Sequence, residues 1–337
     1  CRSGERIERE TLSPAFRFAP DGTAKQVFSI PAGDCTRILA GRPDGSKTRD
    51  TIVSLNHELN RAQGAEHVFV YLGGNDGYLP ERRLEFPAHS AVDGAMCDFF
   101  DTGKVDVLVC NCFEDALHLD DGCYLYQHDE AGLSEEKKVV FPTLHCSGSA
   151  IGDFRRSGYL DIAFGGFCNR EIRIYHGSEK GYSPENVSRV VLGPDDGTYQ
   201  PEKYGEGQDG YMSVPPEERA VTTEFGQVRW MLSADFNCDG WPDLLISEIT
   251  GPRCFILWGG PDGFSKKRMT TLLTDGVSSA KVADLNGNGW PDLILASQQS
   301  TKKNVKYESY VTVYWGGPDG YRENRRMQLP VDRKSVV

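Results

Sequence analysis

The chain has 337 residues, including 37 glycines and 18 prolines, and is 39% hydrophobic and 10% aromatic. This length and composition allow a folded, turn-rich protein, either as one large all-β domain or as two smaller domains. The formal net charge of −12 argues against a nucleic-acid partner, because such proteins gather Lys and Arg to displace phosphate counterions. No apolar run reaches the roughly 18 residues that a membrane span needs, so we expect no such span.

The ten cysteines show neither CxxC pairs nor a Cys/His zinc spacing. We expect no zinc site and mostly thiols in the core, since several cysteines lie in or beside apolar runs. The first ten residues are too polar for a signal peptide, so we expect any export signal to lie outside this sequence. Cys1 has two interpretations: the lipidated first residue of a mature bacterial lipoprotein, or an arbitrary boundary of the chain.

One phrase recurs along the chain, and it defines the repeat units. Its copies are FRFAPDGTAKQ, VYLGGNDGYLPER, LYQHDEAGLSEE, IYHGSEKGYSPE, ILWGGPDGFSKKR and VYWGGPDGYRENR. The corresponding units of a single domain spanning 1–337 lie near 16–70, 71–125, 126–174, 175–256, 257–313 and, in part, 314–337. The one long unit contains residues 193–225, a polar stretch rich in Gly, Pro and Tyr, which we interpret as a surface insertion.

Each unit predicts four strands. The recurrent phrase forms the turn of one hairpin. A second pair of strands flanks an acidic turn, as in WMLSADFNCDGWPDLLISEI. Four-stranded units at this period predict an all-β fold of propeller blades, because radial closure buries both faces of each sheet. A stack of parallel coils is the minor alternative, since it would need a much shorter repeat.

The acidic turns differ in their ligands along the chain. The first unit has only RPDGSKTRD at 42–50, which is irregular in length, and we assign no metal to it. The turns DFFDTGKVD at 98–106 and DFRRSGYLD at 153–161 keep their terminal acids but have weaker inner ligands: Phe100 and Thr102 in the first, Arg155 and Ser157 in the second. In the latter, the guanidinium of Arg155 could neutralise both terminal acids. We expect no tight calcium site in either turn.

Two later turns share the spacing D-x-N-x-[DN]-G-x-x-D. Oxygen ligands at alternate positions, with a glycine at the bend, are what Ca²⁺ requires. An EF-hand is excluded, because its loop needs a glutamate at position 12, where this chain has Ile246 and Leu295. A solvated turn without metal is the alternative. The expected ligands, including backbone carbonyls of the two tryptophans, are Asp235, Asn237, Asp239, Trp241, Asp243, Asp284, Asn286, Asn288, Trp290 and Asp292.

At DFNCDGWPDLLIS, DLNGNGWPDLILAS and WGGPDGF/Y, the sequence resembles FG-GAP or VCBS repeat proteins, which include the α-subunit propellers of integrins. The resemblance implies a β-propeller with structural Ca²⁺ between the first two strands of a blade, at about two sites here. It also implies seven blades, whereas the repeat count leaves six possible. We expect either a fragment of a longer chain or a last blade completed by residues 1–15.

We expect an extracytoplasmic binding module, secreted, periplasmic or on the cell surface, for carbohydrate or for another extracellular protein. Loops on a rigid scaffold usually carry function, and aromatic rings beside acids suit sugars. The insertion supplies the candidate ligand-binding residues Tyr199, Tyr204 and Tyr211.

A polysaccharide lyase or related carbohydrate-active enzyme is the alternative function. Its candidate catalytic residues are His89 and His145, which occupy matching places in consecutive repeats. Shared packing of a repeated position is the simpler explanation, so we expect no enzyme. The sequence also has no nucleophile elbow, phosphate-binding loop or HExxH pattern, which leaves peptidase and nucleotide chemistry without support.

Overall fold

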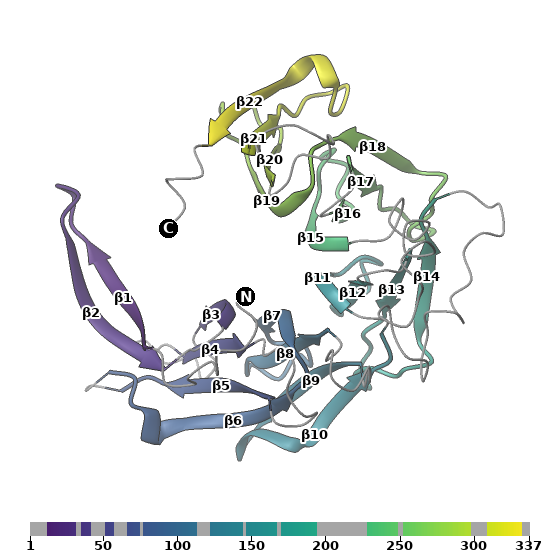
Figure 1. Ribbon diagram of the computed structural model, residues 1–337. Coiled ribbons are helices and arrows are strands. Elements are labelled where there is room, and N and C mark those ends of the chain that lie inside the picture. The colour runs from purple at the N-terminus through teal and green to yellow at the C-terminus, as the bar shows by residue number, and fades with distance from the viewer. Residues whose placement is uncertain are drawn as a thin grey trace, which may run out of the picture. The chain divides into compact units, whose positions relative to one another are not determined.

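A computed structural model gives the fold of the chain (Figure 1). Two units, Cys1–Phe141 and Pro142–Val337, each form a compact body and are described separately. Within the described residues, no helix is long and apolar enough to cross a membrane. The structure describes residues 12–31, 35–41, 51–56, 66–74, 77–112, 122–143, 146–166, 170–193, 228–248, 252–297 and 309–331.

The first unit contains one hairpin and two four-stranded sheets. The hairpin pairs β1 (Leu12–Phe18) with β2 (Ala24–Pro31). The first sheet consists of β3 (Cys35–Gly41), β4 (Thr51–Asn56), β5 (Glu66–Leu72) and β6 (Arg83–Ala88), with the short 3₁₀ helix η1 (Pro80–Arg82) before the last strand. The second sheet consists of β7 (Ala91–Cys97), β8 (Asp106–Asn111), β9 (Cys123–Asp129) and β10 (Gly132–Phe141).

The second unit contains three further four-stranded sheets. Its first sheet consists of β11 (Cys146–Gly152), β12 (Asp161–Gly166), β13 (Glu171–Tyr175) and β14 (Val187–Val191). The second consists of β15 (Val228–Ala234), β16 (Asp243–Glu248), β17 (Arg253–Leu257) and β18 (Met269–Leu273). The third consists of β19 (Val277–Ala283), β20 (Asp292–Ser297), β21 (Ser309–Tyr314) and β22 (Arg326–Val331), with η3 (Glu323–Arg325) before β22.

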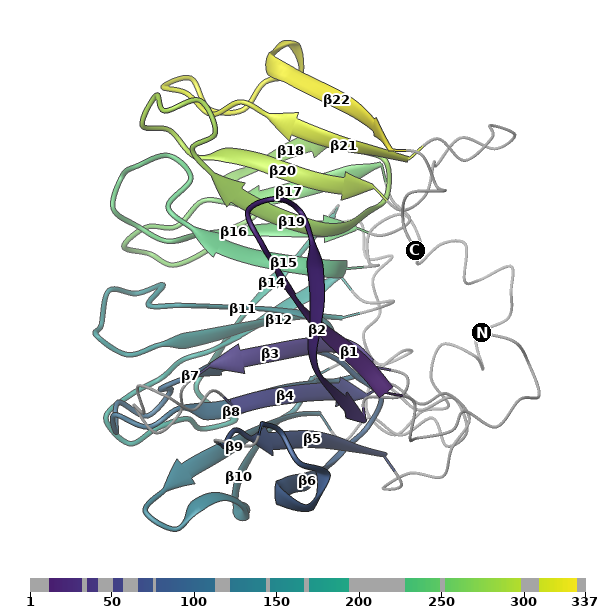
Figure 2. The ribbon, with the colours of Figure 1, turned by 90° about the vertical axis from the view of Figure 1, so that its left-hand side faces the viewer.

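All five four-stranded sheets are built alike. Their strands pair antiparallel in chain order, and the first pair always shifts register after the first residue of the first strand. First strands of successive sheets contact one another within each unit, β3 with β7, and β15 with both β11 and β19. In Figure 1 the fourth strands β14, β18 and β22 of the second unit lie on the opposite side from these first strands, and Figure 2 shows the same sheets from the side. Stacked four-stranded blades confirm the predicted all-β, β-propeller class.

The repeated phrase spans the turn between the third and fourth strands. Its aromatic position falls at the end of a third strand for Tyr175 on β13 and Tyr314 on β21, and in the middle of β9 for Tyr126. The units drawn from this phrase therefore begin two strands later than the structural blades do. By the same phrase, the β1–β2 hairpin corresponds to the third and fourth strands of a blade. The predicted insertion 193–225 lies, apart from Gly193, outside the described residues.

Third-strand tyrosines link neighbouring blades. The Tyr126 hydroxyl donates to the Pro87 carbonyl oxygen over 2.5 Å, on the outer strand β6 of the preceding blade. Tyr314 donates in the same way to the Leu273 carbonyl oxygen over 2.6 Å. Both side chains are fully buried, so each places a large apolar ring between sheets and satisfies its polar end there. The core of the second unit combines aliphatic and aromatic side chains, with Leu244, Ile246 and Leu257 fully buried and Phe154 and Phe255 almost so.

Candidate metal centre

The two complete acidic turns join the first and second strands of adjacent blades. Residues 235–242 link β15 to β16, and residues 284–291 link β19 to β20. The resemblance to FG-GAP repeats implied a calcium site between the first two strands of a blade. Both turns lie at that position. The ninth residue of each turn, Asp243 or Asp292, is also the first residue of the second strand.

The first turn folds around the side chain of Asp235. Its Oδ1 accepts the backbone N–H of Asp239 over 3.0 Å, and its Oδ2 accepts that of Gly240 over 2.8 Å. The Asn237 Oδ1 also accepts the Asp239 N–H, over 3.1 Å. The Asp239 Oδ1 accepts the N–H of Trp241 over 2.8 Å. The alternate oxygen-bearing side chains thus all turn inward toward the loop backbone.

The second turn repeats this hydrogen-bond frame. Asp284 accepts the N–H groups of Asn288 over 3.1 Å and of Gly289 over 2.8 Å. The Asn288 Oδ1 accepts the N–H of Trp290 over 2.9 Å. The same contacts in two separate blades indicate that the spacing of the motif fixes the loop conformation.

Two positions of each turn adopt left-handed backbone. At the fourth position φ is 56° for Cys238 and 71° for Gly287, and at the sixth it is 86° for both Gly240 and Gly289. A glycine at the sixth position adopts this conformation without steric cost, which accounts for the invariant D/N-G pair of the motif. Cys238 is a non-glycine residue in this region, where such residues are uncommon.

The ninth-position aspartate ties the acidic turn to the glycine phrase. Asp243, fully buried, accepts the N–H of Phe236 over 2.8 Å and that of Gly259 over 2.8 Å. Asp292 likewise accepts the N–H of Gly316 over 2.8 Å. A Cβ at Gly259 would lie 2.2 Å from the Pro242 carbonyl oxygen, so only glycine fits this approach. The acidic turn and the glycine phrase therefore recur together, because the ninth-position aspartate of the turn accepts a backbone N–H of the glycine phrase.

The electrostatics of the first turn favour a cation. Burial, together with the negative charges of Asp239 and Asp235, raises the pKa of Asp243 to about 6, against the opposing effect of its two backbone hydrogen bonds. A positive ion in the turn would relieve this repulsion.

The donor set of both turns fits Ca²⁺. Every side-chain donor is a hard oxygen, from three carboxylates and one amide in residues 235–243 and from two carboxylates and two amides in residues 284–292. Each of these oxygens that accepts one N–H keeps a second lone pair for a metal. The calcium affinity of such loops rises with ligand charge, so the first turn is the stronger candidate.

The turn at 98–106 keeps the frame, although Phe100 and Thr102 stand at its third and fifth positions. Asp98 accepts the N–H groups of Thr102 over 2.9 Å and Gly103 over 2.7 Å, and Asp106 accepts those of Phe99 and His128. The terminal aspartates thus have a structural role that needs no metal.

The turn at 153–161 carries its own cation. Arg155, at the third position, places its Nη2 3.0 Å from Asp161 Oδ1 and 2.7 Å from the Gly177 carbonyl oxygen. Asp153 instead accepts the N–H groups of Ser157 and Gly158, each over 2.7 Å. The guanidinium therefore neutralises the buried ninth-position acid, while the first-position acid holds the loop backbone.

The candidate catalytic histidine His89 is a packed side chain. It is 6% exposed, its ring centroid lies 5.7 Å from that of Tyr124, and its backbone N–H donates to Asn111 Oδ1 over 3.0 Å. This environment agrees with the packing explanation. The other candidates, His145, Tyr199, Tyr204, Tyr211 and the possible lipid site Cys1, lie outside the described residues.

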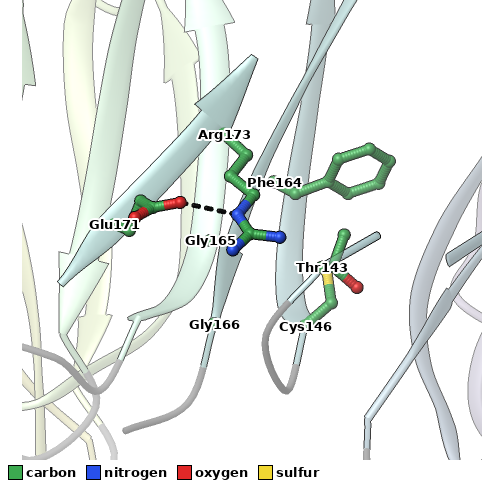
Figure 3. A pocket seen from close by; sticks show the side chains of 7 residues that line it. All are labelled: Thr143, Cys146, Phe164, Gly165, Gly166, Glu171 and Arg173. Atoms are coloured by element: carbon green, nitrogen blue, oxygen red, sulfur yellow. Dashed lines mark hydrogen bonds and ion pairs between the residues drawn. The ribbon is translucent and has the colours of Figure 1, made fainter. Parts of the chain in front are cut away.

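A small pocket was not predicted (Figure 3). It lies at the end of blade β11–β14 opposite the acidic turn, where Arg173 Nε donates to Glu171 Oε1 over 2.6 Å. Burial alone would lower the pKa of Arg173, but the hydrogen bond and charge of Glu171 raise it overall. The sequence signal was the alternation EIRIY, with charges inside a buried strand. The pocket is lined by Thr143, Cys146, Phe164, Gly165, Gly166, Glu171 and Arg173.

Residues 235–295, which contain both complete turns, match the model of the FG-GAP-like repeat. No curated protein matches the chain.

Several solved structures resemble the chain. A candidate 6-phosphogluconolactonase from Bacteroides fragilis is similar with a TM-score of 0.53 and 10% identity, covering 95% of this chain and 76% of that one. A second one, from Bacteroides uniformis, has a TM-score of 0.50, 12% identity and coverages of 94% and 76%. The exotype rhamnogalacturonan lyase YesX has a TM-score of 0.47, 13% identity and coverages of 92% and 52%. At these identities the two Bacteroides structures show likeness of fold alone.

Proposed function

We propose that this chain is a calcium-stabilised binding module that works outside the cytoplasm. The proposal starts from the match of residues 235–295 to the FG-GAP-like repeat. The observation that carries the proposal is the pair of complete acidic turns with one hydrogen-bond frame. Calcium would be held by the side-chain oxygens of Asp235, Asn237, Asp239, Asp243, Asp284, Asn286, Asn288 and Asp292, with carbonyl oxygens of Trp241 and Trp290.

The role of the ion is structural. Its ligands belong to tight turns whose aspartates also bind the loop backbone. Such ligands are poorly placed to release a coordination position to substrate, whereas a catalytic metal needs an open one. Bound calcium supplies positive charge that offsets the clustered carboxylates, and it stabilises the folded state by mass action.

Ligand binding is assigned to the opposite end of blade β11–β14. Val191, the last residue of β14, pairs with Glu171, so the chain enters the insertion 193–225 at the end of the blade that carries the pocket. A buried arginine at the end of the blade where the insertion begins suits a carboxylate-bearing ligand. An acidic polysaccharide is therefore the preferred carbohydrate, and another extracellular protein is the alternative partner.

A polysaccharide panel tests the proposal. The protein would be titrated calorimetrically with acidic and neutral polysaccharides, while ultraviolet absorbance follows unsaturated products. We expect saturable binding of an acidic polysaccharide without product, weakened at least tenfold by Arg173→Lys, whose ammonium cannot donate in the planar fork of arginine. Steady product formation would replace the binding module by a lyase. Absence of binding to every polysaccharide would leave a protein partner.

A further inference from the structure

Two cysteines face each other across neighbouring strands of blade β7–β10. The register of β8 and β9 pairs Val109 with Tyr124, which places Cys110 opposite Cys123. The next pair along confirms this alignment, since Asn111 Nδ2 donates to the Gly122 carbonyl oxygen over 2.8 Å. The two residues are therefore direct cross-strand neighbours.

The distance between the two thiols suits a covalent link. Their Sγ atoms lie within 4.8 Å of each other, and both residues are fully buried thiols. Directly opposed residues of an antiparallel pair have Cα atoms about 4.5–5.5 Å apart, inside the range of about 4.4–6.8 Å that a disulfide spans. Rotation of the side chains can thus close the gap without a shift of either strand.

The repeat provides an internal comparison. In blade β15–β18 the same two positions are Ser247 and Cys254, which are paired in register. There the Ser247 hydroxyl donates to the Trp230 carbonyl oxygen over 3.1 Å, and burial raises the pKa of the Cys254 thiol to about 12. Blade β15–β18 therefore holds one buried thiol at these two paired positions, whereas blade β7–β10 holds two.

We propose that Cys110 and Cys123 are a modification site that forms a cross-strand disulfide with a disulfide oxidant such as oxidised glutathione. One cysteine, as its thiolate, attacks a glutathione sulfur, forming a mixed disulfide and releasing one glutathione thiolate. The second cysteine, as its thiolate, attacks the protein sulfur of that bond and releases the second glutathione. Two thiol protons pass to the two glutathiones, and the two electrons lost by the protein reduce one oxidised glutathione.

The bond would tie β8 to β9 and close the loop between them. Such a cross-link constrains the unfolded chain more than the folded one, so oxidation raises the stability of this blade. Because both thiols are buried, the native protein reacts only through local opening, and oxidation is faster during refolding.

Mass spectrometry of the unmodified full chain tests the proposal. One sample is incubated natively with oxidised glutathione, and another is refolded from urea in a glutathione redox buffer. Both are then denatured, alkylated with N-ethylmaleimide and digested without reduction. We expect a peptide pair linked through positions 110 and 123, two hydrogens lighter than the reduced pair, together with a higher Tm. Cys254 is the internal control and remains alkylated.

A variant separates this link from general thiol oxidation. Cys110→Ala should lose both the linked peptides and the gain in Tm, while Cys123 becomes alkylated or glutathionylated. Full alkylation of Cys110 and Cys123 in both wild-type samples would overturn the proposal. So would a link that joins either residue to a different cysteine.

Discussion

At the scale of single residues, the ninth-position aspartates of four turns hold the fold through backbone hydrogen bonds, in the turns proposed to bind calcium and in the others alike. Asp106, Asp161, Asp243 and Asp292 are all fully buried. Asp106 accepts one N–H from its own turn and one from His128 near the end of the third strand, and Asp243 accepts one from its own turn and one from Gly259 just after the third strand. A carboxylate suits this position because it offers two acceptors and no donor.

Asp106→Asn should therefore destabilise the protein even without calcium. The amide keeps one acceptor but points its NH₂ group at a second N–H, so the free energy of unfolding should fall by about 2 kcal/mol. Asp101→Asn is the control, because this exposed residue has a left-handed φ of 54° that asparagine tolerates. Urea unfolding in chelator measures both variants. Equal stability of the two would refute the structural role.

The same residue predicts a pH dependence. Burial is the main cause that raises the pKa of Asp106, against its backbone hydrogen bonds. The folded state therefore holds this proton more tightly than the unfolded state, so the contribution is fully present below about pH 3.9 and is lost as pH rises through the folded pKa. The stability difference between wild type and Asp106→Asn should shrink from pH 4 to pH 7 in urea unfolding. A difference that widens with pH would reverse the assigned sign.

At the scale of elements, the blades are joined through their third strands. The hydroxyl of Tyr126 donates to the carbonyl oxygen of Pro87 on β6, and that of Tyr314 donates to the carbonyl oxygen of Leu273 on β18. In the recurrent phrase, the tyrosine therefore connects neighbouring blades. A glycine that follows it donates its backbone N–H to the ninth-position aspartate of the acidic turn.

Tyr126→Phe should remove this connection while keeping the packed ring. We expect a loss of about 1 kcal/mol in the free energy of unfolding, the usual net value of one hydrogen bond. Tyr159→Phe, on an acidic turn, should change stability by less than about 0.5 kcal/mol. Chemical denaturation of both variants decides the matter. An unchanged midpoint for Tyr126→Phe would show that the hydroxyl contributes nothing.

Much of this element-level architecture could be predicted from the sequence, because it rests on local spacing. The D-x-N-x-[DN]-G-x-x-D turns set their own hydrogen bonds, and the glycine phrase marks each second hairpin. Contacts between distant positions left no such signal. The burial of His89 against Tyr124, for example, depends on neighbouring strands.

At the scale of the whole molecule, the fold is one blade design repeated. The described residues contain five such blades and one hairpin, and the register shift at the start of each blade recurs in all five. The fold likeness at 10% identity to a Bacteroides structure fits this view. A repeated unit keeps its fold when its turns and strand pairing are kept, even as other positions vary.

Thermal unfolding with and without calcium is the decisive measurement for the two proposed calcium sites. Calcium should raise the Tm of the wild-type chain over that in chelator, each site adding about 2.7 kcal/mol at 100 times its Kd. The double variant Asp239→Ser, Asn288→Ser is the matched control, because a serine at this position still accepts the turn N–H, as Ser157 does from Tyr159 over 3.3 Å. We predict that its calcium shift is largely lost while its Tm in chelator stays close to that of wild type. An identical wild-type Tm in chelator and in saturating calcium would contradict the account.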